Sequence, residues 1–86
     1  MALFKIVLKN SVEKDLKRVD RSQVSRLLRA IEDLSGDPFP ASSKKLVGSN
    51  QTYRVRVGDY RIIYIVNRTS REIEIERVRH RKEVYR

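Results

Sequence analysis

The dipeptide Gly58-Asp59 limits the fold more than any other feature of this sequence. It lies between two segments rich in β-branched and aromatic residues, 53–57 and 60–66. Glycine followed by a polar residue suits a two-residue hairpin turn, and such a turn fixes the register of the strands on either side. We therefore predict four facing pairs: Val57 with Tyr60, Arg56 with Arg61, Val55 with Ile62, and Arg54 with Ile63.

This register gives the hairpin one apolar face and one basic face. The apolar face carries Tyr53, Val55, Val57, Tyr60, Ile62 and Tyr64. On the other face, Arg56 and Arg61 lie directly opposite each other, and such a like-charged pair destabilises a sheet by a few tenths of a kcal/mol to about 1 kcal/mol. A sequence shaped by stability alone would avoid this pair, so we expect it to serve a function.

The rest of the chain predicts an α+β domain. Alternation of Phe4, Ile6 and Leu8 with polar positions indicates a first strand. Apolar residues then recur at helical spacing over 12–19 and 24–34, which predicts two short amphipathic helices. Strand patterns return from Thr52 onward. The order is β-α-α-β-β-β, with an N-terminal helical hairpin packed on an antiparallel sheet.

The last strand is predicted to contain a β-bulge. A four-residue turn at 67–70 places Ile75 opposite Ile62, Ile73 opposite Tyr64, and Glu76 beside Arg61. With this alternation the Val78 side chain would point away from the core, unless one extra residue is accommodated near Glu76 and Arg77.

Such a bulge turns Arg79 and Arg81 toward the face that carries Arg54, Arg56 and Arg61. Guanidinium groups that converge on one surface predict a phosphate site, because their planar paired donors match phosphate oxygens.

Length and charge point to one basic domain spanning residues 1–86. The 20 Lys and Arg against 11 Asp and Glu give a net charge of +9, which favours a polyanionic partner, RNA or DNA first. Without Cys, and with His80 as the lone histidine, we expect no metal site and no cofactor. No apolar run approaches the roughly 18 residues of a membrane span, so we expect a soluble cytoplasmic protein with no membrane partner.

Each candidate residue also has a plain structural explanation. Arginines on a strand usually form a solvated face or protect an edge from aggregation. Lys44 and Lys45 suit a solvated segment before a strand, His80 suits a surface position, and Tyr85 suits packing of a chain end onto the sheet.

Three blocks of the sequence together resemble the RelE/ParE toxin superfamily. They are Lys44-Lys45-Leu46-Val47-Gly48, the segment YRVRVGDYRIIY at 53–64, and the segment VRHRKEVYR at 78–86. The resemblance covers essentially the whole chain and implies the fold predicted above. Its RelE branch implies an endoribonuclease, metal-independent, that cuts messenger RNA in the ribosomal A site. The implied partners are the ribosome, the messenger and a cognate antitoxin of the RelB kind.

The resemblance also implies roles for particular residues. The phosphate-binding arginine corresponds to Arg61, a second functional arginine to Arg81, the terminal tyrosine to Tyr85, and two basic strand positions to Arg54 and Arg56. Lys44, Lys45, Arg79 and Lys82 are expected to contact RNA or the ribosome.

The general acid and base remain unassigned, because Arg54 and Arg56 stand where the family often has Lys, and Arg does not give up its proton. His80 is a hypothesis for one of these roles, since its unperturbed pKa is near neutrality.

Two other functions remain open. The ParE branch implies a DNA gyrase inhibitor without nuclease activity, and a simple basic RNA-binding module would bind without cleaving.

Overall fold

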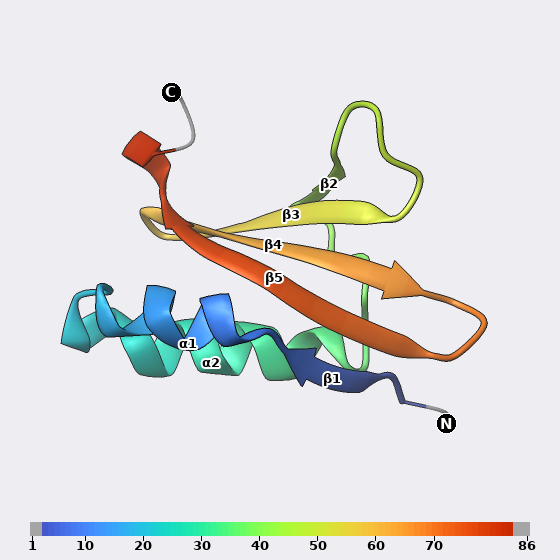
Figure 1. The fold of residues 1–86 in the computed structure, drawn as a ribbon, viewed down its shortest axis with the longest axis horizontal. Helices are drawn as coiled ribbons and strands as arrows, with labels where there is room; N and C mark the ends of the chain where they lie inside the picture. The colour runs from blue at the N-terminus through green and yellow to red at the C-terminus, as the bar shows by residue number, and fades with distance from the viewer. Residues whose placement is uncertain (1–2, 84–86) are drawn as a thin grey trace.

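The computed structural model describes residues 3–83. The elements follow in the order β1 (Lys5–Leu8), α1 (Asn10–Lys17), α2 (Arg21–Leu34), β2 (Ser43–Lys45), β3 (Thr52–Val57), β4 (Tyr60–Asn67), β5 (Glu72–His80) and the short 3-10 helix η1 (Arg81–Glu83). The strands form one sheet in the order β1-β5-β4-β3-β2, with both helices against one face (Figure 1). The predicted α+β class is confirmed. We call the helix-free side of the sheet the outer face.

The sheet is mixed. β1 runs parallel to β5, from the pair Lys5 and Glu72 to the pair Leu8 and Ile75, and the other three strand pairs are antiparallel as expected. β2 is an additional edge strand that the sequence pattern did not predict. It is only three residues long and contains no apolar alternation.

The central hairpin has the predicted register. Gly58 adopts a φ of 60°, the positive value that two-residue hairpin turns require at their first central position. All four predicted pairs of β3 and β4 are confirmed, including Arg56 opposite Arg61. The turn therefore determines which side chains share the outer face.

The register between β4 and β5 differs from the prediction by two residues. Ile75 lies opposite Tyr64 and Ile73 opposite Val66, because β4 continues to Asn67 and the connecting loop is 68–71. Arg71 takes the left-handed conformation in that loop, with a φ of 56°. Because the facing pairs shift by an even number of residues, the same side chains still point toward the helices.

The predicted bulge is confirmed at Glu76. The register changes between Ile63 and Tyr64 of β4, so that Arg77 lies opposite Ile63 and Glu76 is the extra residue. The predicted neighbour of Arg61 is wrong: Arg79, and not Glu76, lies opposite it. After the bulge, Val78 returns to the core side.

The core lies between the sheet and the two helices. It is formed chiefly by Val12, Leu27, Ile31, Leu34, Ile62, Tyr64, Ile73 and Ile75. Burial of each aliphatic side chain contributes about 1.5–3 kcal/mol. The buried Tyr64 hydroxyl donates to the Pro38 carbonyl oxygen at 2.8 Å, which satisfies its polar end. Within residues 3–83, no helix is long and apolar enough to cross a membrane.

Candidate active site: an arginine row on the outer face

Three arginines lie in directly opposed positions across three neighbouring strands. Arg56 of β3 faces Arg61 of β4, and Arg61 in turn faces Arg79 of β5. Neighbouring strands are about 4.8 Å apart, so the row spans about 10 Å at the backbone. We call Arg56, Arg61 and Arg79 the arginine row. Its guanidinium groups can bind the oxygens of one phosphate from several sides, or two successive phosphates.

Two more cations extend the row along β2 and β3. Lys44 faces Arg54, one position further along the same face. A shallow hollow of about 260 Å³ is lined by Ser42, Lys44, Arg54, Arg56 and Arg61. The structure thus brings together Lys44, Arg54, Arg56, Arg61 and Arg79 from the predicted set.

The hairpin turn orients Arg56 and Arg81, which lie next to it. The Arg56 Nε donates to the Gly58 carbonyl oxygen at 3.0 Å. The backbone N–H of Arg81 donates to the Asp59 carbonyl oxygen at 2.7 Å, and its Nε lies 4.0 Å from the Asp59 carboxylate. The Arg81 side chain is 50% exposed, so it stands beside the arginine row and remains accessible to a ligand.

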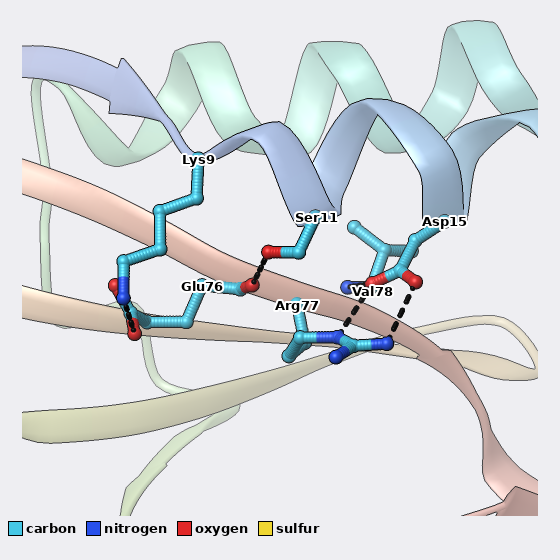
Figure 2. A network of polar contacts seen from close by, with 6 residues as sticks. All are labelled: Lys9, Ser11, Asp15, Glu76, Arg77 and Val78. Carbon is cyan, nitrogen blue, oxygen red and sulfur yellow. Dashed lines mark hydrogen bonds and ion pairs between the residues drawn. The ribbon is translucent and has the colours of Figure 1, made fainter.

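Helix α1 holds the bulge of β5 that precedes Arg79, and Figure 2 shows its contacts with Glu76, Arg77 and Val78. The Asp15 carboxylate accepts from Arg77 at 2.9 and 3.0 Å and from the backbone N–H of Val78 at 2.9 Å. The Ser11 hydroxyl donates to the Glu76 carbonyl oxygen at 2.9 Å. The contacts with Glu76 and Val78 use backbone groups on the β5 edge where β1 no longer pairs. They fix the strand immediately before Arg79.

Sequence reasoning missed Asp15 and Arg77. A signal for Asp15 was present, because a carboxylate stood on the apolar side of the first helix, between Val12 and Val19. A buried carboxylate in that position needs a partner.

Some predicted residues lie elsewhere. His80 is paired with Tyr60 on the helix side of the sheet, and their rings meet edge to face at 5.2 Å. Lys45 lies opposite Tyr53 of β3, also away from the arginine row. Lys82 follows in η1, where its backbone N–H donates to the His80 Nδ1 at 3.2 Å. Tyr85 lies outside the described residues.

The far end of the outer face carries carboxylates. Glu72 and Glu74 lie there beside Val7 and Ile65. A hydrogen bond with Glu76 raises the pKa of Glu74, and burial adds to this effect. The Lys9 ammonium donates to Glu76 at 2.8 Å, and this bond raises the pKa of Lys9. Nearby cations, including Lys5 opposite Glu72, offset these carboxylates, whereas the arginine row lies near the Gly58-Asp59 turn, so a polyanion is favoured at the Gly58-Asp59 end of the sheet.

The chemistry available at the arginine row is charge stabilisation. Arginine stays protonated, so these residues can bind a phosphate and stabilise negative charge as it develops, but they cannot accept a proton. Residues 3–83 contain no group of three or more His, Asp or Glu side chains placed to hold a metal ion.

Comparison with known proteins agrees with this architecture. Residues 6–85 match the family described as the ParE toxin of the type II toxin-antitoxin system parDE. RelE1 of Methanocaldococcus jannaschii is 34% identical over 86 residues, with 96% of each chain covered.

Two solved complexes are similar in sequence and in structure. The RelE–RelB complex from Pyrococcus horikoshii aligns with a TM-score of 0.81 at 30% identity, over 94% of this chain and 97% of the other. The RelB–RelE antitoxin–toxin complex from Methanococcus jannaschii aligns with a TM-score of 0.75 at 33% identity, over 92% and 94%. The chain therefore belongs to the RelE/ParE superfamily of toxins from type II toxin–antitoxin systems.

Proposed function

We propose that this toxin is an endoribonuclease that cuts messenger RNA in the ribosomal A site and thereby inhibits translation. The observation that carries the proposal is the arginine row, in which Arg56, Arg61 and Arg79 face one another, although like charges directly opposite each other generally destabilise a sheet. Arg54, Lys44 and Arg81 add positive charge around it. A phosphate is the ligand that this array suits best.

The proposed reaction is attack by a ribose 2′-OH on the adjacent phosphorus. The O2′–P bond forms, the P–O5′ bond breaks, the 2′ proton passes to a base, and the leaving O5′ takes up a proton. The products carry a 2′,3′-cyclic phosphate and a 5′-OH. Arg61 and Arg79 stabilise the dianionic phosphorane, Arg56 and Arg54 hold the phosphate in place, and these charges need no metal ion.

Three roles complete the proposal. Arg81, beside the Asp59 carboxylate, stabilises the leaving oxygen. Tyr85 orients the nucleotide by stacking. Acid–base catalysis by His80 remains a prediction, and it requires a change in position because His80 now contacts Tyr60 on the helix side.

We further propose an antitoxin of the RelB kind as the partner. Both solved relatives above were described as complexes of a RelE toxin with RelB. The net charge of +9 favours an acidic or amphipathic antitoxin segment. Lys44, Lys45 and Lys82 are proposed to contact RNA or the ribosome.

Inhibition of DNA gyrase is the second candidate, because the matching family is described as the ParE toxin. A defined messenger translated on purified ribosomes distinguishes the two functions. Breaks in the A-site codon, mapped by primer extension, support the endonuclease. Intact messenger together with inhibited supercoiling by gyrase would instead support the alternative.

A further inference from the structure

A second cleft lies between the C-terminal end of α1 and the last residues of β5. Its volume is about 260 Å³, and its walls include Arg18, Arg77, Arg79, Tyr60 and His80. Arg79 and His80 already have proposed roles, but Arg18, Arg77 and Tyr60 have none. Arg18, the C-cap residue that follows α1, is exposed.

The charge of this cleft favours an anion. Its one carboxylate belongs to Asp15, which already accepts from Arg77 and from the Val78 backbone N–H. Arg18, Arg77 and Arg79 line the cleft against this single carboxylate, so its lining is positively charged overall. The neighbouring hollow under the hairpin turn contains both Asp20 and Asp59, which disfavour phosphate.

The cleft also offers aromatic surface for a nucleobase. The rings of Tyr60 and His80 meet edge to face, with an interplanar angle of 85°. The Tyr60 hydroxyl accepts from the Asp20 backbone N–H at 3.2 Å, and the His80 Nδ1 accepts from the Lys82 backbone N–H at 3.2 Å. Both rings are thus held in place. Single-stranded RNA is recognised by cationic side chains beside such rings.

Arg79 connects the two sites, since it is a member of the arginine row and also lines the cleft. We propose that an RNA strand bound on the arginine row continues over the β5 edge, and that the cleft binds its next nucleotide. Arg18 and Arg79 bind the phosphate, and the base lies against His80 and Tyr60. This inference rests on the proposed ribonuclease function and extends its substrate site by one nucleotide.

The test is binding of a trinucleotide and a hexanucleotide RNA, 2′-O-methylated to prevent cleavage, by fluorescence anisotropy over a series of salt concentrations. Arg18→Ala removes the proposed phosphate contact. Lys17→Ala is the matched control, because Lys17 is also an exposed cation at the same end of α1 and does not line the cleft. Both variants are expected to fold, since both side chains are exposed.

Arg18→Ala is expected to weaken hexanucleotide binding and to lower its log–log salt slope by about 0.7, the contribution of one phosphate contact on a single strand. Trinucleotide binding stays unchanged. His80→Ala is expected to weaken hexanucleotide binding by about tenfold without changing the slope, because stacking is not ionic.

If the unmodified protein binds RNA but Arg18→Ala and Lys17→Ala weaken hexanucleotide binding equally, the cleft proposal is overturned. The ribonuclease proposal is not affected by that result. Failure of the unmodified protein to bind either RNA would also overturn the cleft, whereas the ribonuclease is tested separately by messenger cleavage on purified ribosomes.

Discussion

Arg61 on β4 lies directly opposite Arg79 on β5. The bulge at Glu76 creates this pair, because without the extra residue Arg79 would point toward the helices and Val78 away from them. One local irregularity therefore buries Val78 and completes the arginine row.

Relief of charge repulsion should make the sheet more stable. Arg61→Thr removes the cation that faces both Arg56 and Arg79 and introduces a good strand former. We expect the free energy of unfolding in urea to rise by a few tenths of a kcal/mol to about 1 kcal/mol. Lys45→Thr, which faces Tyr53, should show no such gain. A loss of stability specific to Arg61→Thr would refute the account of opposed charges.

Asp15 is expected to be the most sensitive polar position. It is 7% exposed and accepts from both Arg77 and Val78, so Asp15→Ala leaves a buried N–H and a partly buried guanidinium without their acceptor. We expect a loss of about 2–4 kcal/mol in the free energy of unfolding. Asp15→Asn keeps an acceptor for Val78 and should lose less. If Asp15→Ala changes stability no more than the exposed Glu13→Ala, the contact does not stabilise the fold.

Ionisation of Tyr64 is expected to lower the free energy of unfolding at alkaline pH. Burial raises the pKa of Tyr64 above its ordinary 10.0. Its stabilising contribution is therefore complete below pH 10 and is lost as the pH rises toward the folded-state pKa, by about 1.4 kcal/mol per pH unit. Tyr64→Phe should be less stable at pH 7 by about 1 kcal/mol, since Pro38 loses its donor. Unfolding curves of both proteins from pH 8 upward should converge, and parallel curves would contradict this explanation.

The hairpin and the bulge could be predicted from sequence because both follow from local constraints. Gly58 fixes one register, and the parity of Val78 then requires an extra residue before it. The alternation of side chains along β5 then places Arg79 on the outer face and His80 on the helix side, although the two residues are neighbours in the sequence motif. The exact loop was not predictable, because Arg71 adopts a positive φ that nothing in its side chain indicates.

Long-range pairings were less accessible from sequence. Alternation in β1 is the same for a parallel and an antiparallel neighbour, so the pairing of Lys5 with Glu72 could not be deduced. β2 is short and polar, and only its partner β3 makes it a strand. The contacts of Asp15 depend on how α1 lies along β5, which is a tertiary property.

The most direct test of the arginine row is the rate of messenger cleavage on purified ribosomes, measured by primer extension for the unmodified toxin and for Arg61→Ala and Arg79→Ala. The account predicts A-site breaks that slow by about 10²–10³-fold in each variant, as for loss of a group that stabilises the transition state. Arg29→Ala, which removes an exposed charge from α2, should cut at the normal rate. Equal rates in all four proteins, or an intact messenger throughout, would contradict the account.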